Sequence, residues 1–257
     1  MASAAFFDLD RTLISGASVF PFAVEAWRTG LVKNSEIFRW GMSALSFKLM
    51  GDTGGDAVER GRQDFLEKIA GVEVDRIYEV GRSMLPGLVN EVRPESKKLL
   101  RMHHDAGRDT WIVSASPIGI VEGLADALGM TGAIGTKAIM VDGFFTDQLD
   151  GPFVYGPGKA EAITKLAAER GYDLSGCYAY SDSISDLPML ETVGHPVAVN
   201  PDGALESIAY DRAWPIVIFS RKRKRVMAVS SAAASAAVGI VGAYGLGRMH
   251  GKGAALR

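Results

Sequence analysis

The stretch Ala4-Ala5-Phe6-Phe7-Asp8-Leu9-Asp10, residues 4–10, is an apolar run that stops at two acids one residue apart. Side chains alternate across a β-strand, so we expect the Asp8 and Asp10 carboxylates to leave the same edge at the strand's carboxyl end. Two acids this close repel each other unless a cation lies between them, and Mg²⁺ takes oxygen ligands of this kind. The alternative for this motif alone is a strand that ends in solvated acids, which favour turns.

Two later segments also place phosphate-binding groups where an element ends or begins. The apolar run 111–113 leads into Ser114, Ala115 and Ser116, whose hydroxyl and turn N–H groups can bind a phosphate oxygen. Further on, Gly156-Pro157-Gly158 leads into Lys159 at the start of a helical pattern. A solvated lysine is the alternative there, but the helix dipole slightly disfavours a cation in the first turn, which favours a functional role.

A fourth segment runs from the apolar residues 177–180 into Ser181, Asp182 and Asp186. Asp182 and Asp186 are four residues apart, so both can face one crevice if Asp186 lies on the first turn of a helix. The alternative is that Asp182 or Ser183 caps the helix that follows. Capping and metal binding are compatible.

The ordered set of residues 8–12, 113–116, 158–159 and 181–186 resembles the four motifs of the haloacid dehalogenase superfamily. More narrowly, it is similar to the subclass IB hydrolases, the phosphoserine phosphatase-like branch. The resemblance extends over residues 4–218. It implies an α/β fold with a Rossmann-like parallel sheet core, an inserted helical cap, and phosphomonoester hydrolase activity.

The resemblance also implies a role for each motif acid. Asp8 would attack phosphorus and form an aspartyl-phosphate. Asp10 would protonate the leaving alkoxide and then activate the hydrolytic water. Mg²⁺ would be held by Asp8, the backbone carbonyl of Asp10 and Asp182. Asp186 would orient Lys159 or a metal-bound water from behind.

The phosphoryl oxygens would be bound by Ser114, Ala115 and Lys159. In the cap, Arg60 and Arg62 could bind a carboxylate or phosphate of the substrate, although cap arginines are more often solvated.

The sequence departs from the pattern of the phosphoserine phosphatases of this branch in two segments. Phosphoserine phosphatases of this branch carry a Glu soon after the first motif, whereas residues 15–18 here are Ser-Gly-Ala-Ser and the next acid is Glu25. Ser183 and Ser185 also stand where those enzymes carry Gly and Asn.

The periodicity of apolar residues and the glycine-containing breaks between periodic segments divide the chain into a core, a cap and a tail. We expect residues 1–14 and 92–219 to form the catalytic core and residues 15–91 the helical cap. Within the core, residues 139–146 read as a hairpin with an Asp-Gly turn. The helices expected in the cap span residues 19–28, 34–49, 56–70 and 74–89.

The tail is unlike the rest of the chain. Five consecutive cations, residues 221–225, precede an uncharged stretch from 226 to 247 that is long enough to cross a bilayer as a helix. Basic residues on the near side predict a cytoplasmic enzyme tethered to the inner face of the cell membrane. The alternative is a tail that lies on the lipid surface or is disordered. Small residues recur every fourth position and could pair two copies as a homodimer, namely Ser235, Gly239, Ala243 and Gly247.

Composition narrows the function further. The chain has 257 residues and a formal net charge of −2, which argues against nucleic acid as the main partner, and its single cysteine excludes an internal disulfide. The sequence therefore predicts a Mg²⁺-dependent phosphomonoester phosphatase for a small, phosphoserine-like metabolite. Three alternatives stay open. They are a membrane-associated lipid phosphomonoesterase with a lysophosphatidate-like substrate, a phosphotransferase, and a non-catalytic membrane-tethered binding protein.

Overall fold

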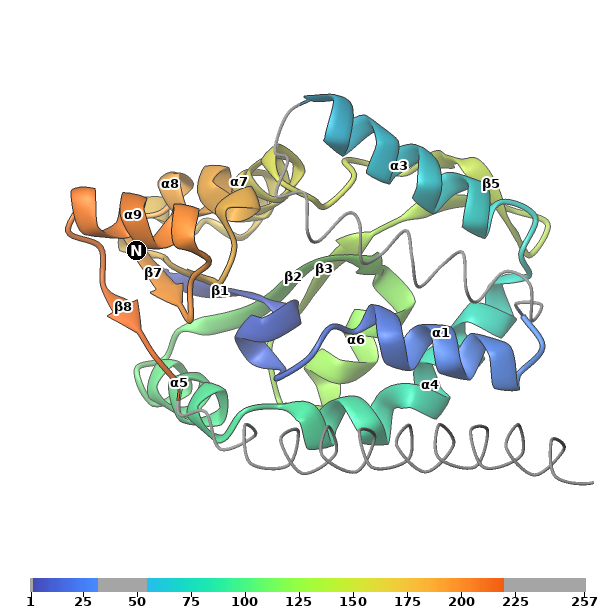
Figure 1. The fold of residues 1–257 in the computed structure, drawn as a ribbon, viewed down its shortest axis with the longest axis horizontal. Coiled ribbons are helices and arrows are strands. Elements are labelled where there is room, and N and C mark those ends of the chain that lie inside the picture. The colour runs from blue at the N-terminus through green and yellow to red at the C-terminus, as the bar shows by residue number, and fades with distance from the viewer. Residues whose placement is uncertain (1, 32–54, 220–257) are drawn as a thin grey trace, which may run out of the picture. The chain divides into compact units, whose positions relative to one another are not determined.

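A six-stranded parallel sheet lies at the centre of the computed structural model, which describes residues 2–31 and 55–219 (Figure 1). Its strand order is β3-β2-β1-β6-β7-β8. This arrangement confirms the predicted α/β fold with a parallel core. The strands are β1 (Ala4–Asp8), β2 (Asp109–Pro117), β3 (Gly132–Thr136), β6 (Tyr178–Ser181), β7 (His195–Val199) and β8 (Ile216–Val217).

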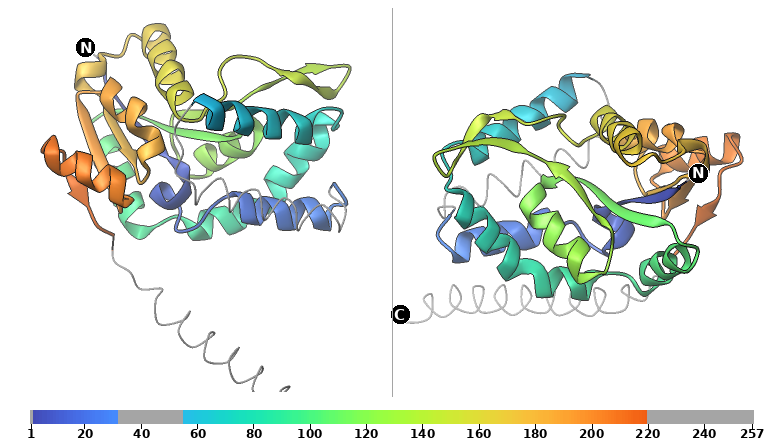
Figure 2. Two further views of the ribbon diagram at one scale, coloured as in Figure 1. Left: turned by 45° about the horizontal axis from the view of Figure 1, so that its top comes forward. Right: turned by 180° about the vertical axis from the view of Figure 1, so that it is seen from behind.

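Helices cover both faces of the sheet. Helices α5 (Pro94–Asp105) and α6 (Ile118–Ala127) lie on one face, and α7 (Pro157–Arg170), α8 (Leu187–Thr192) and α9 (Gly203–Asp211) lie on the other (Figures 1 and 2). Because parallel strands joined through helices are covered on both faces, β1 is buried along its whole length.

The direction of strand addition reverses at β1. The chain adds β2 and β3 on one side of β1 and later adds β6, β7 and β8 on the other. Strands β1 and β6 are neighbours, with Phe7 opposite Tyr180, so the residues that follow these two strands meet at one edge. In open α/β sheets, ligands bind in the crevice at such a reversal.

The segment between β1 and α5 contains three described helices, α1 (Val19–Arg28), α3 (Gly55–Ile69) and α4 (Val74–Glu91). They match three of the four helices expected in the cap, and the expected helix 34–49 lies outside the described residues. The two connections to the core are bonded to each other, because the Ser15 N–H donates to the Glu91 carbonyl and the Arg93 N–H donates to the Leu13 carbonyl. Core and cap belong to one compact unit, residues 1–218.

The predicted hairpin is present as β4 (Ala138–Val141) and β5 (Phe144–Leu149). Its turn residues Asp142 and Gly143 have φ values of 50° and 84°, as a two-residue Asp-Gly turn requires. The hairpin packs on the cap, where the Phe145 N–H donates to the Val72 carbonyl at 2.9 Å.

The predicted membrane segment, residues 226–247, and the stripe of small residues within it lie outside the described part of the chain. Among the residues that the structure describes, no helix is long and apolar enough to cross a bilayer.

Candidate active site

Asp10 does not lie on the strand that carries Asp8. Strand β1 ends at Asp8, and the next five residues, Leu9–Leu13, form a single wide turn, η1, closed by the Ile14 N–H on the Leu9 carbonyl at 3.1 Å. The predicted strand alternation therefore does not apply to Asp10. The two carboxylates are nevertheless close enough that the charge of Asp10 raises the pKa of Asp8. The turn sends the chain into the cap, and the Asp10 Oδ1 accepts the Ser18 N–H at 2.7 Å.

Lys159 is buried between two carboxylates. Its Nζ lies 2.6 Å from the Asp8 Oδ1 and 2.7 Å from the Asp186 Oδ2, and all three residues are at most 8% exposed. The Ser181 hydroxyl donates to the same Asp186 oxygen at 2.7 Å. The structure thus joins the first, third and fourth motifs through one ammonium group.

Burial and charge act against each other on this cluster. The pKa of the Asp8 carboxyl is raised to about 6. Burial is the largest cause, the charges of Asp186 and Asp10 also raise this pKa, and Lys159 lowers it. Burial alone would lower the pKa of Lys159, but the Asp186 and Asp8 carboxylates outweigh it and raise that pKa above its usual value. Lys159 is therefore a fixed positive charge beside Asp8 at neutral pH.

Asp182 follows β6 and lies opposite Arg11 of turn η1. The Arg11 Nε is 2.7 Å from the Asp182 Oδ2. The loop that carries Asp182 is fixed by Asp202, whose backbone N–H donates to the Asp182 carbonyl and whose carboxylate accepts the N–H groups of Ile184 and Leu205. Asp186 ends the short 3₁₀ turn η3 (Ile184–Asp186), and the Ser183 side chain caps that turn by accepting the Ser185 N–H.

The second motif lies beside β1, because Val113 pairs with Asp8 in register. Ser114 is buried, and its Oγ accepts the Ser116 N–H at 3.2 Å, which leaves the hydroxyl hydrogen of Ser114 to donate elsewhere. Ala115 is half-buried at the same strand end. The Ser116 Oγ lies 3.3 Å from the Ser18 Oγ, so this edge meets the start of the cap.

The cap arginines Arg60 and Arg62 lie on α3. Arg62 pairs with Glu59 one turn earlier on the same helix, and Arg60 is exposed. For Arg62, this contact fits a solvated helix face better than a substrate contact.

The charges at the crevice suit a divalent cation. Among the motif residues that the structure describes, four carboxylates (Asp8, Asp10, Asp182 and Asp186) and two cations (Lys159 and Arg11) carry a summed formal charge of −2. Among the described residues, no three His, Cys, Asp or Glu side chains gather closely enough to hold a metal by themselves. The expected set needs only two carboxylates and the Asp10 carbonyl, a hard oxygen set that fits Mg²⁺.

Each of the three residues before Lys159 suits the backbone conformation or packing at its position. Gly156 has a φ of 54°, which favours glycine, and Pro157 begins α7 where its missing N–H costs nothing. At Gly158, a Cβ would lie 1.9 Å from the Phe153 carbonyl oxygen. The motif therefore needs glycine at 158 so that α7 can approach the preceding loop and bring Lys159 into the crevice.

Replacing Gly158 with alanine is expected to destabilise the protein by roughly 1–3 kcal/mol, because a backbone atom must move to relieve the overlap. Urea unfolding of the purified protein measures this change. Gly87→Ala is the matched control, since nothing lies within 4 Å of a Cβ at Gly87 on α4 and alanine is the better helix former. Equal stability of the two variants would contradict this account of Gly158.

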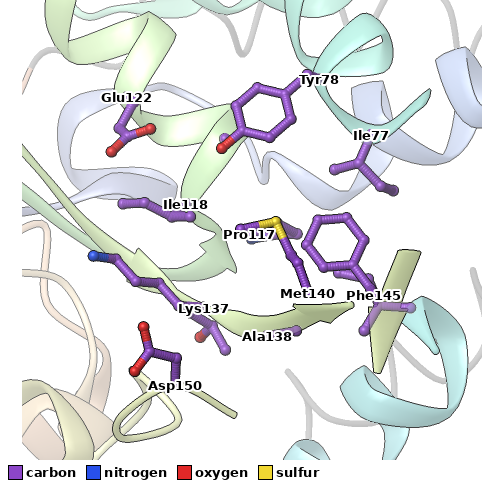
Figure 3. A pocket seen from close by; sticks show the side chains of 13 residues that line it. Ile77, Tyr78, Pro117, Ile118, Glu122, Lys137, Ala138, Met140, Phe145 and Asp150 are labelled. Atoms are coloured by element: carbon purple, nitrogen blue, oxygen red, sulfur yellow. The ribbon is translucent and has the colours of Figure 1, made fainter. Parts of the chain in front are cut away.

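A separate pocket of about 240 Å³ lies between the cap and the core (Figure 3). Its walls come from α4, the start of α6, the segment after β3 and the hairpin, and include Ile77, Tyr78, Pro117, Met140 and Phe145. None of the motif acids, nor Ser114 or Lys159, lines it. The pocket is therefore distinct from the crevice at the strand ends.

Residues 5–191 match the model of the haloacid dehalogenase-like hydrolase family. The chain belongs to this family. Among curated relatives of this hydrolase, a probable phosphatase of Mycobacterium tuberculosis is 41% identical over 93% of this chain and 84% of its own length. A phosphoserine phosphatase of the same organism is 36% identical over 95% of this chain and 80% of its own length. A solved structure from Bordetella pertussis, of a protein of unknown function, has a TM-score of 0.72, 26% identity, and covers 84% of this chain and 98% of its own.

These findings confirm the predicted family, and the chain is a phosphomonoester hydrolase of the haloacid dehalogenase type. Sequence reasoning missed four residues that contact the motif acids of this hydrolase. Arg11 and Ser181 are sequence neighbours of Asp10 and Asp182, so this adjacency could have predicted that they contact the site. Ser18 and Asp202 contact the site only through the fold, and no local pattern marks them.

Proposed function

We propose that this hydrolase cleaves phosphomonoesters through Asp8 as the nucleophile. The observation that carries the proposal is the buried Lys159 ammonium between Asp8 and Asp186 at the carboxyl end of β1. Lys159 holds the Asp8 Oδ1, and we assign the attack on phosphorus to Oδ2. The bond from phosphorus to the ester oxygen breaks as the bond to Asp8 forms.

We assign the proton transfers of both steps to Asp10. Its Oδ1 accepts the Ser18 N–H, which fixes the carboxyl group at the mouth of the cap. In the first step Asp10 gives its proton to the leaving alkoxide. In the second it takes a proton from the water that attacks the aspartyl-phosphate, so inorganic phosphate leaves and Asp8 is regenerated.

The phosphoryl oxygens are bound by fixed donors. The Ser114 hydroxyl, the Ala115 N–H and the Lys159 ammonium are assigned to them, and a preorganised donor stabilises the charge that develops during transfer. Mg²⁺ would be held by Asp8, the Asp10 carbonyl and Asp182, where it would neutralise negative charge on the transferring group. Hydrolases of this family generally use this ion.

Dialysis against a chelator is expected to lower the rate on a small soluble phosphomonoester at least about 100-fold, a loss comparable to that of one essential catalytic group. Added Mg²⁺ should restore the rate, whereas Ca²⁺ should not, because it prefers more ligands at longer distances. Steady-state rates in the three conditions measure this. Full activity in excess chelator would show that the reaction does not require a divalent cation.

For the substrate we propose a small phosphorylated metabolite. The support is the 36%-identical phosphoserine phosphatase of Mycobacterium tuberculosis. Two observations argue against phosphoserine itself. The segment that contacts Asp10 carries the hydroxyl and N–H of Ser18 and no acid, and the next acid, Glu25, pairs with Arg28 on α1. A panel of phosphoserine, a sugar phosphate and lysophosphatidate tests this choice. A higher kcat/KM for lysophosphatidate than for both small esters would favour the lipid alternative instead.

A further inference from the structure

Arg11 adopts a backbone conformation that arginine rarely takes. It lies in the middle of turn η1 with a φ of 64° and a ψ of −6°, in the left-handed region. Glycine enters this region freely, whereas any side chain with a Cβ meets a steric penalty there. Strain that persists beside catalytic groups points to a function for the side chain that causes it.

The Arg11 side chain contacts one particular acid. Its Nε lies 2.7 Å from the Asp182 Oδ2; the Asp182 side chain is 5% exposed and that of Arg11 is 40% exposed. The Asp202 N–H holds the backbone carbonyl of Asp182 at 2.8 Å. Asp182 is therefore the fixed member of the pair, and Arg11 is the member with room to move outward.

We infer that Arg11 competes with the divalent cation for Asp182 and so sets how tightly the protein binds that cation. This inference rests on the proposed function, which assigns Asp182 to the cation. A cation held by Asp182 would lie close to the Arg11 guanidinium, whose Nε is 2.7 Å from the Asp182 Oδ2, and like charges at short range repel. Arg11 is thus a positioning residue that keeps Asp182 paired until the cation displaces it.

Calorimetric titration of the full-length protein with Mg²⁺ alone, without substrate, tests the competition. Arg11→Gln and Arg11→Gly are each expected to bind Mg²⁺ about ten-fold more tightly, because the cation then neither displaces an ion pair nor binds beside a like charge. Gln removes the charge and keeps the strained backbone, whereas Gly removes both. Equal affinities of the two variants would therefore assign the effect to charge and not to backbone strain.

Two further variants control for other effects. Arg11→Lys keeps the positive charge and is expected to stay within about two-fold of the wild-type affinity, since charge sets the competition. Arg28→Gln removes an exposed arginine that pairs with Glu25 on α1, and its Mg²⁺ affinity should equal that of the wild type. Thermal unfolding gives a second readout: without Mg²⁺, Arg11→Gln should melt below the wild type, and saturating Mg²⁺ should close or reverse that gap.

The variant Asp182→Asn distinguishes a wrong cation site from a wrong competition between Arg11 and the cation. If this variant binds Mg²⁺ as the wild type does, the cation site of the proposed function is wrong, and the inference fails with it. If Asp182→Asn loses binding while Arg11→Gln binds with unchanged affinity, only the competition is overturned. Weaker binding by Arg11→Gln would also overturn it, because Arg11 would then be holding Asp182 in place for the cation.

Discussion

Asp8→Asn is expected to lower phosphatase activity at least about 100-fold, because a neutral amide is a poor nucleophile and replaces the only group assigned to attack phosphorus. The fold should survive, since Lys159 retains Asp186 as a partner 2.7 Å away. Single-turnover rates on an aryl phosphate measure the chemical step directly. Wild-type activity in the purified variant would show that Asp8 is not the nucleophile.

Asp10→Asn is the informative comparison for this experiment. An aryl phosphate has a leaving group that needs no proton, so the first step should proceed while hydrolysis of the aspartyl-phosphate slows. We expect a burst of phenol equal to the enzyme concentration and a phosphorylated protein that mass spectrometry detects. Asp8→Asn should give neither signal. A burst in both variants would mean that the phosphoryl group goes to another residue.

Lys159→Ala is expected to lose activity and also to destabilise the protein by about 3–5 kcal/mol, the usual cost of leaving buried carboxylates without their partner. Asp8 and Asp186 both contact the Lys159 ammonium and both are buried. Water therefore does not replace the lost ammonium as a partner of either carboxylate. Lys165→Ala is the matched control on the same helix: Lys165 is exposed, and its loss should change stability by less than about 0.5 kcal/mol.

The double variant Lys159→Met/Asp186→Asn separates stability from catalysis. It removes one positive and one negative charge together, so urea unfolding should show most of the lost stability restored, while activity stays low because the phosphoryl oxygens lack the Lys159 charge. Recovery of activity together with stability would show that Lys159 has only a structural role.

Much of the fold could be predicted from local pattern. The apolar runs before Asp8 and Ser114 became β1 and β2, and the Asp142-Gly143 turn became the hairpin, because parallel strands buried on both faces and two-residue turns each leave a strong local signal. The end of β1 could not be read in this way. An apolar residue between two acids fits strand alternation as well as it fits the turn η1, and the contacts of that turn with the cap decide between them.

The sequence by itself determined the family and the order of the motifs, because each motif is a short run of residue types that the family model matches. It also predicted the residues to which the chemistry is assigned here. Only the tertiary structure decided which of these groups meet. Lys159 and Asp8 are 151 positions apart, and the strand reversal at β1 together with the close approach of α7 at Gly158 brings them to 2.6 Å. The pairing of Arg11 with Asp182 and of Ser18 with Asp10 follows from the same geometry. Such long-range contacts depend on how whole elements pack, and no local pattern of residues encodes them.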